Sequence, residues 1–271
     1  MKRKKFDFVI WLINKDGPIV KLANFVHGAK RLWGLGDWRA KRQARKMLPQ
    51  FEVKDRELFV FLNGPSVKKQ PLERVARRKD IDCIFVNQGF KLPQYKMLHP
   101  KFHVFIDTKL LKGIWDVHWI DEILGMVPDI TFVMPPSWAK HPVIKPYVDR
   151  GVRILWWQTP IKNLAHGVSA TAFQLGWRLG YKRIYFTGYE QTATPAYMLK
   201  QASHFYGNDP DVETHDTTYI IKDLYMNACH LLVAQASARY AKEIGVDMVN
   251  LTDGGLMDMF RRERFEDVFP E

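Results

Sequence analysis

A run of five apolar residues that stops at a small polar turn constrains the fold of this chain more than any other stretch. The run is Leu58-Phe59-Val60-Phe61-Leu62, and Asn63-Gly64-Pro65-Ser66 follows it directly. A continuous apolar run with β-branched and aromatic members, closed by Asn-Gly-Pro, is typical of a buried strand in a parallel sheet. The polar turn then lies at the carboxyl end of the strand, where open α/β sheets bind ligands.

The turn itself has two interpretations. Gly64 lets a ligand approach the backbone closely, and Ser66 can cap the helix that follows. A helix N-terminus with unpaired N–H groups favours an anion such as phosphate. The alternative is an ordinary strand-to-helix turn, because the motif is shorter than a dinucleotide-binding fingerprint.

The rest of the chain alternates between strand and helix patterns. Apolar runs predict further strands over residues 81–89, 102–108, 130–134, 153–157, 182–188 and 246–251. Helical spacing predicts helices over residues 72–78, 119–126, 167–180 and 223–244, and a charged C-terminal helix after Gly254-Gly255. We therefore predict one α/β, Rossmann-like domain with a mainly parallel sheet over residues 51–271.

Three features of this predicted domain bear on function. Asn63, Asn87 and Asp107 each follow a strand, so a doubly wound sheet would bring them to one rim. Residues 192–216 lack a clear period, which predicts a lid or binding loop over about residues 190–218. The long helix over residues 223–244 carries a predicted buried stripe of Leu224, Ala228, Leu231, Leu232, Ala238 and Tyr240.

The positive charge is concentrated at the start of the chain. The formal net charge is +12, and residues 1–50 hold 13 Lys and Arg against 3 Asp and Glu. Within this segment, residues 6–13 are apolar but too few to span a bilayer, and Gly34-Leu35-Gly36 divides a predicted helical stretch over residues 20–48. Trp11, Trp33 and Trp38 beside these cations favour contact with an anionic membrane surface. A helical cap with a solvated basic face fits the pattern equally well.

The sequence shows no sign of a metal site or of nucleic-acid binding. Cys83 and Cys229 lie far apart in apolar runs, which indicates reduced core cysteines and no metal-binding spacing. No motif in the body interleaves basic and aromatic residues, so we expect no binding of nucleic acid.

The order of the motifs resembles that of the bacterial sialyltransferases of glycosyltransferase family 42. The resemblance rests on Asn63-Gly64-Pro65-Ser66, Asn87-Gln88, His166-Gly167-Val168, the stretch over residues 179–188, Ser203-His204-Phe205-Tyr206-Gly207 and the stretch over residues 250–256. It covers about residues 57–268 and leaves the basic segment unmatched. Pterin diphosphokinase-like proteins of the archaeal type share the Asn-Gly-Pro-Ser start and the Leu-Gly-Tyr-Lys strand.

The resemblance implies an inverting, metal-independent transfer of an acidic sugar, of the sialic acid or Kdo type, from a CMP-activated donor. It implies no cofactor. The acceptor would be a glycan or glycolipid of the cell surface, such as lipopolysaccharide or capsule. The basic segment over residues 1–50, not the resemblance, predicts a cytoplasmic enzyme that attaches peripherally to the inner membrane. A homo-oligomer stays open. The residues implied to bind the nucleotide are Asn63, Gly64, Pro65, Ser66, Asn87, Gln88, Gly167, Gly188 and Tyr189.

The chain departs from the family pattern in two places, one that bears on the donor sugar and one that bears on the general base. Where the family has Thr-Ser-Gly before the phosphate-facing helix, this chain has Ala165-His166-Gly167. Where the family has its basic histidine, this chain has Asn208, which cannot take a proton at neutral pH. The candidates for the general base are therefore His204, His166, His215 and Glu190. Tyr206 is the first candidate to donate a hydrogen bond to the leaving phosphate, and Tyr189 and Tyr197 follow.

Two rival functions remain open. An ATP-dependent diphosphokinase of the pterin type would need magnesium, for which Asp107, Glu190 and Asp253 could supply carboxylates. A catalytically degenerate protein that binds a nucleotide sugar would need no base at all.

Overall fold

The computed structural model of the protein describes residues 37–161, 164, 166–208 and 216–271. The predicted apolar stretch over residues 6–13 and most of the predicted helical stretch over residues 20–48 lie outside the described residues.

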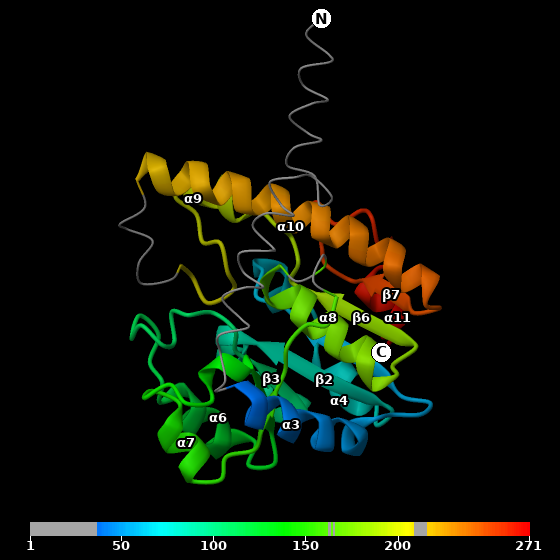
Figure 1. Ribbon diagram of the computed structural model, residues 1–271. Coiled ribbons are helices and arrows are strands. Elements are labelled where there is room, and N and C mark those ends of the chain that lie inside the picture. Colours follow the sequence, from blue (N-terminus) through cyan, green and yellow to red (C-terminus); the bar gives the residue numbers. More distant parts are fainter. Residues whose placement is uncertain (1–36, 162–163, 165, 209–215) are drawn as a thin grey trace, which may run out of the picture.

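Eight parallel strands form one sheet in the described part of the chain (Figure 1). Their order is β5-β4-β3-β2-β1-β6-β7-β8, so the chain builds outward from β1 to β5 and then returns to the other side of β1. This confirms the predicted α/β, Rossmann-like fold. The strands are β1 Glu57–Phe61, β2 Ile81–Val86, β3 Phe102–Val104, β4 Thr131–Met134, β5 Ile154–Trp156, β6 Arg183–Thr187, β7 Asp247–Asn250 and β8 Arg261–Arg262.

Helices cover both faces of this sheet (Figure 1). The α-helices are α3 Asp37–Met47, α4 Glu73–Arg77, α5 Tyr95–Leu98, α6 Trp119–Met126, α7 Lys145–Asp149, α8 Gly167–Leu179, α9 Ala193–Met198, α10 Thr217–Glu243 and α11 Phe265–Val268. Short 3₁₀ helices are η1 Leu48–Phe51, η2 Pro65–Lys69, η3 Asn87–Lys91 and η4 Pro136–Trp138.

The core forms because β1 is buried on both faces. Leu58 points toward α8, where Gly176 lies against it, whereas the ring of Phe59 lies 5.6 Å from that of Phe269 beside α11. Phe61 stacks on Phe85 of β2 at 4.4 Å between ring centroids. A strand that packs against helices on both faces must be apolar throughout, which explains the continuous run in the sequence.

Helix α8 joins the two halves of the sheet. It follows β5, contacts β1, β2 and β3, and leads into β6. Gly180 ends it in the left-handed conformation, with φ +95°, as its position after the last apolar residue predicts.

Several local predictions are wrong. Ser66 does not cap a helix, because η2 begins after Gly64 and has no side-chain cap. The stretch over residues 192–216, which shows no period in the sequence, contains the helix α9, whereas the lid over about residues 190–218 stays a prediction. After Gly254-Gly255 the chain forms the short strand β8 before the four-residue helix α11, so the charged C-terminal helix is much shorter than predicted.

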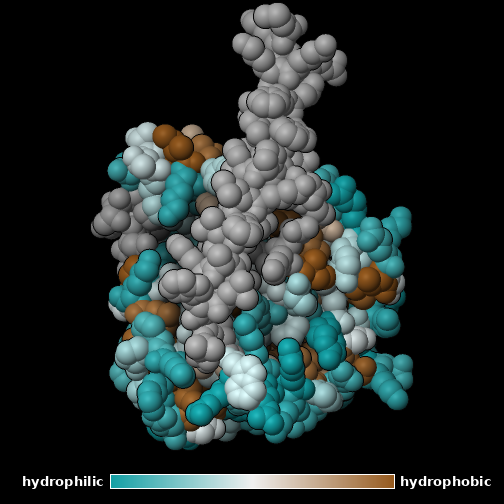
Figure 2. All heavy atoms as spheres, in the orientation of Figure 1, coloured by the Kyte–Doolittle hydropathy of each residue, from teal (hydrophilic) through white to brown (hydrophobic). Residues whose placement is uncertain are grey.

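The predicted buried stripe of α10 is also wrong for Leu224, Ala228 and Leu232. Leu224 and Leu232 are 52% and 40% exposed, Ala228 is exposed, and Ile221 and Tyr225 lie exposed beside them. Figure 2 shows hydrophobic side chains at this end of the molecule. The physical reason is that a polar face of the same helix turns inward, as described below.

Helix α3 packs on the edge of the sheet at β5. Ala40, Ala44 and Leu48 are buried there, whereas the exposed Arg42 stacks over the exposed ring of Trp38. Residues 37–48 thus form a helical cap with a basic outer face. Among the described residues, no helix combines the length and apolar character needed to cross a bilayer.

Two glycine substitutions test the packing of α8. A methyl group at Gly176 would lie 2.7 Å from Leu58 Cδ2 and 2.9 Å from Ile184 Cδ1, whereas one at Gly125 of α6 meets nothing within 4 Å. We expect Gly176→Ala to lower the free energy of unfolding by about 1–3 kcal/mol through overpacking. We expect Gly125→Ala to raise it by about 0.5–1 kcal/mol, because alanine favours helix. Urea denaturation of both variants checks this, and stabilisation by both would contradict the close packing of α8.

Candidate functional site

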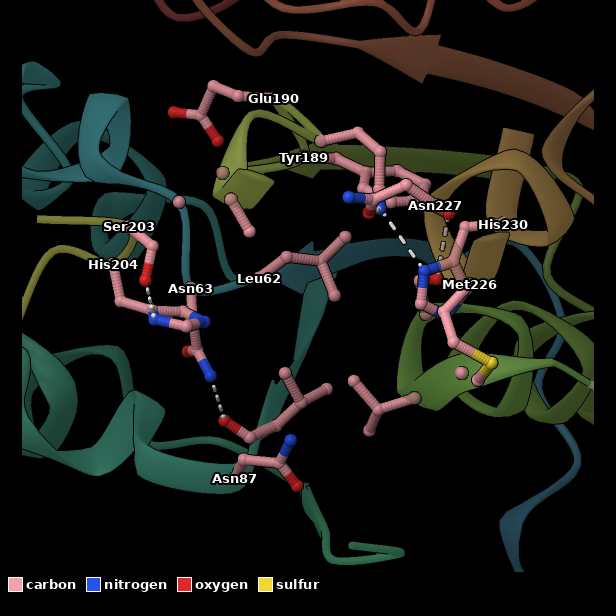
Figure 3. Close-up of a pocket in the computed structure, with 18 of the residues that line it drawn as sticks. Leu62, Asn63, Asn87, Tyr189, Glu190, Ser203, His204, Met226, Asn227 and His230 are labelled. Atoms are coloured by element: carbon pink, nitrogen blue, oxygen red, sulfur yellow. Dashed lines mark hydrogen bonds between the residues drawn. The ribbon is translucent and has the colours of Figure 1, made fainter. Parts of the chain in front are cut away.

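A pocket of about 460 Å³ opens where the strand order reverses, at the carboxyl ends of β1 and β6 (Figure 3). Connections from the two strands lead to opposite sides at this point, which leaves a crevice in doubly wound sheets. Asn63, Asn87 and Asp107, which follow β1, β2 and β3, all line it. The predicted convergence of these three residues on one rim is therefore confirmed.

Two glycines form the floor of the pocket. The N–H of Gly64 donates to the carbonyl of Gly188 at 2.8 Å, and a side chain at Gly188 would come within 2.5 Å of the Leu62 carbonyl oxygen. A methyl group at Gly64 would overlap the carboxylate of Glu190. The loops after β1 and β6 can touch only because both positions are glycine.

Glu190 is buried beside this contact. Its Oε1 accepts a hydrogen bond from the N–H of Ser66 at 2.7 Å. This N–H group, which the sequence suggested as a hydrogen-bond donor to a phosphate, is therefore already bonded to a carboxylate of the protein. Oε2 has no hydrogen-bond partner among the described residues. Glu190 thus holds the loop after β1 in place and keeps one oxygen available to a ligand.

Asn63 and Asn87 present amide groups to the pocket. Asn63 is buried, and its Nδ2 donates to the carbonyl of Val86 at 3.2 Å, which fixes the orientation of its amide. Within the described chain, Asn63 Oδ1 and Asn87 Oδ1 have no hydrogen-bond partner. Two buried acceptors without partners favour a ligand that brings hydroxyl or amino groups.

The N-terminus of α8 forms the opposite wall. Gly167, Val168 and Ser169 line the pocket, and the first turn of α8 has neither a side-chain cap nor an acidic residue. Its N–H groups and the helix dipole favour an anion. Burial keeps Tyr189 protonated by raising its pKa to about 12, and its hydroxyl bonds that of Ser169 at 3.0 Å.

Two histidines lie in ring contact beside this helix end. The rings of His166 and His230 are 4.4 Å apart between centroids, and both residues line the pocket. Burial lowers the pKa of His166, and burial together with the nearby His166 lowers the pKa of His230 to about 4. Both rings are therefore neutral at pH 7 and can accept a proton when an anion binds nearby.

His204 lies across the pocket on the loop after α9. Its Nδ1 is 2.8 Å from Ser203 Oγ, which is 3.2 Å from Asn208 Oδ1. Asn208 Oδ1 also accepts from the Ser203 N–H at 3.0 Å. The His204 ring stacks on Tyr206 at 4.9 Å between centroids. Asn208 thus orients the serine that contacts the imidazole.

One face of α10 completes the pocket. Asp223, Asn227 and His230 stand at helical spacing and face inward: Asp223 accepts from Thr194, and Gln191 Nε2 bonds both Asn227 and, at 3.1 Å, His230 Nδ1. This polar network ties α10 to α9 through Thr194 and to the loop after β6 through Gln191. It also explains why the apolar face of α10 is exposed, because only one face of a helix can turn inward.

The structure brings most of the predicted site residues together. Those that line the pocket are His204, His166, Glu190, Asn63, Gly64, Asn87, Gly167, Gly188 and Tyr189, with Tyr197 beside them. Tyr206, Pro65, Ser66 and Gln88 are not among the lining residues: Pro65 is exposed, Ser66 is held by Glu190, and Gln88 accepts from Lys91. His215 lies outside the described residues.

The carboxylates predicted for magnesium do not meet. Asp107 and Glu190 line the pocket, but Asp253 lines a different one beside Arg262. In the ranges that the structure describes, no group of three or more His, Cys, Asp or Glu side chains is placed to hold a metal ion.

Sequence reasoning missed the contribution of α10. Asp223, Met226, Asn227 and His230 line the pocket, whereas the apolar stripe alone predicts a buried face made of other residues. The signal was present, since polar residues at positions i, i+4 and i+7 form a face of their own.

Comparison with solved structures finds a similar fold in one glycosyltransferase. The MAf glycosyltransferase from Magnetospirillum magneticum AMB-1 matches 79% of this chain with a TM-score of 0.51 and 11% identity. The match spans 34% of that protein, so this chain covers about a third of its length. At this identity the likeness shows the fold alone.

A second match is the sialyltransferase CstII from Campylobacter jejuni, solved with cytidine 5'-monophosphate. It has a TM-score of 0.42 and 14% identity, over 76% of this chain and 84% of that one. A likeness this loose carries no argument about the site. No protein-family model matches the sequence, and no similar sequence was found among curated proteins.

The stability of the protein should fall in acid, partly through His230. Its pKa is about 4 in the folded protein and about 6.5 when unfolded, so the unfolded chain binds more protons between these values. The contribution of neutral His230 to the unfolding free energy is complete above about pH 6.5 and is lost as the pH falls toward 4. We expect His230→Gln to reduce the loss of unfolding free energy between pH 7 and 4.5 by about 1–3 kcal/mol.

Urea denaturation across this pH range measures the effect, with His118→Gln as the control because His118 is exposed. Equal losses in wild type and His230→Gln would show that His230 does not titrate as its burial requires.

Proposed function

We propose that this protein is a glycosyltransferase that moves an acidic sugar from a CMP-activated donor to a glycan acceptor. The observation that carries the proposal is the convergence of Asn63, Asn87, His166 and His204 on one pocket at the reversal point of the sheet. The fold shared with the MAf glycosyltransferase supports a transferase at the coarse level. The choice of CMP rests on the order of sequence motifs that resembles glycosyltransferase family 42.

The two walls of the pocket suit the two ends of such a donor. The amide oxygens of Asn63 and Asn87 would accept from the hydroxyl or amino groups of cytidine. The first turn of α8 would receive the phosphate, since its N–H groups lack a cap and His166 lies beside them. Charge that develops on the leaving phosphate would be stabilised by these N–H groups and by the protonated phenol of Tyr189.

His204 is the histidine best placed to serve as the general base. Asn208 Oδ1 can only accept, so the Ser203 hydroxyl donates to it and then accepts from Nδ1–H of His204. The neutral ring then carries its lone pair on Nε2, which would take the proton of the acceptor hydroxyl as that oxygen attacks the anomeric carbon. His166 is a weaker base because burial lowers its pKa. Glu190 is held by the N–H of Ser66.

The acceptor and the place of action are part of the same proposal. A cell-surface glycan or glycolipid would be modified at the inner membrane, and the basic segment over residues 1–50 would attach the enzyme there. The exposed cations of α3 beside Trp38 support this attachment, because tryptophan and basic residues together favour anionic headgroups.

A panel of nucleotides tests the donor class. We expect CMP to raise the melting temperature of the protein, because a ligand that binds only the folded state stabilises it. UDP and ATP should raise it less, with or without magnesium. A larger shift with ATP and magnesium than with CMP would favour the diphosphokinase over the sugar transferase.

Substitution of the proposed base separates catalysis from binding. We expect His204→Gln to lower kcat about 10²- to 10⁴-fold, because an amide cannot take the proton. Affinity for CMP should stay unchanged, since the base acts on the acceptor. Asn208→Ala should cause a smaller loss of kcat, because it releases Ser203 without removing the imidazole.

Release of CMP from a panel of CMP-activated acidic sugars, with and without glycan acceptors, measures these rates. His99→Gln, on the surface, is the matched control. Undiminished turnover by His204→Gln would reject His204 as the base. Binding of CMP without turnover by the wild type would instead favour the degenerate binding protein.

A further inference from the structure

A buried polar chain runs beneath the pocket and ends at Asn87. His103, in the middle of β3, is fully buried. Its Nε2 lies 2.7 Å from the backbone carbonyl oxygen of Asn87, and its Nδ1 lies 2.9 Å from the hydroxyl of Tyr95, which is also fully buried. These two hydrogen bonds therefore link the helix α5, the strand β3 and the residue that follows β2.

The chemistry of the partners fixes the direction of both hydrogen bonds. A carbonyl oxygen only accepts, so Nε2 of His103 carries the hydrogen and donates to Asn87. Nδ1 then holds the lone pair and accepts from Tyr95. Burial lowers the pKa of His103 to about 3, so the ring stays neutral in this form across the physiological pH range.

The residue at the end of the chain has an unusual backbone. Asn87 has a φ of +49°, in the left-handed region that residues with a side chain seldom adopt. The preceding carbonyl, that of Val86, accepts from Asn63 Nδ2. Asn63, which follows β1, and His103 of β3 thus hold two consecutive carbonyls at the end of β2, one from each neighbouring strand.

A polar pair at this depth is not needed to fill the core. The rings of Phe85, Phe105 and Phe132 surround Tyr95 and His103 at 4.6–6.2 Å between centroids. Apolar residues would fill such a space without the cost of removing polar groups from water. What Tyr95 and His103 add is a directed hydrogen bond to a strained residue that lines the pocket.

We propose that Tyr95 and His103 are positioning residues, which hold the backbone of Asn87 in its left-handed conformation so that its side chain can bind the nucleoside. This inference rests on the proposed function. Neither residue lines the pocket, so both act through Asn87.

The test compares affinity for CMP among variants of the full chain. We expect His103→Leu to raise the Kd about tenfold or more, and Tyr95→Phe to raise it by a smaller factor. His103→Gln should restore much of the affinity, because its amide can donate to Asn87 and accept from Tyr95. In turnover, the loss should appear in KM for the donor more than in kcat.

Tyr181→Phe is the matched control. Tyr181 is an equally buried tyrosine, but its hydroxyl bonds Asp82 and it does not line the pocket. It should lower stability with the Kd for CMP unchanged. If His103→Leu and Tyr95→Phe bind CMP as tightly as the wild type, or lose no more affinity than Tyr181→Phe, the inference is overturned.

A second readout needs no ligand. Long-range proton–nitrogen NMR spectra of the histidine rings should show His103 neutral, with the hydrogen on Nε2, from pH 7 down to pH 4. A hydrogen on Nδ1, or protonation near pH 6.5, would overturn the inference by itself. If the wild type binds no cytidine nucleotide, the proposed function fails and with it the assignment of the nucleoside to Asn87, whereas the spectra still decide whether the chain holds that residue.

Discussion

The backbone contact between Gly64 and Gly188 is the constraint on which the site depends. Strands β1 and β6 are neighbours whose connections lead to opposite sides of the sheet, so their ends part just beyond the last paired residues. The hydrogen bond between the two glycines joins β1 and β6 once more beyond these residues, at the floor of the crevice. Any side chain at either position would meet Glu190 or the backbone, and the two walls of the pocket could no longer face each other.

Helix α10 leaves its apolar face exposed because its polar face lines the pocket. Its inward face carries Asp223, which hydrogen bonds to Thr194 of α9, and Asn227 and His230, which hydrogen bond to Gln191 in the loop after β6. Ile221 and Leu224 are exposed. Burial of the apolar face would be the more stable choice for a helix judged alone. Natural chains break such local rules mainly at functional sites, so the inverted helix supports the assignment of this pocket as the site.

The sequence was sufficient for β1 to β7 and for the strand-end part of the site, because an apolar run closed by Asn, Gly or Pro indicates a buried strand and the turn that ends it. Asn63 and Asn87 could be placed on one rim from strand order alone. The short elements could not be foreseen: β8 has two residues and α9 has six, too few to show a period. The orientation of α10 and the exclusion of Tyr206 from the pocket follow from tertiary hydrogen bonds and a tight turn, which leave no periodic signal.

We expect cytidine and its phosphate to bind between the strand ends of β1 and β2 and the first turn of α8. A crystal structure of the protein with CMP tests this placement. The cytidine should lie within hydrogen-bond distance of the Asn63 and Asn87 amides, with the phosphate at the backbone N–H groups of Gly167 and Val168. CMP bound at the opposite edge of the sheet, beside Arg56 and Lys101, or bound here without contact to either asparagine, would contradict it.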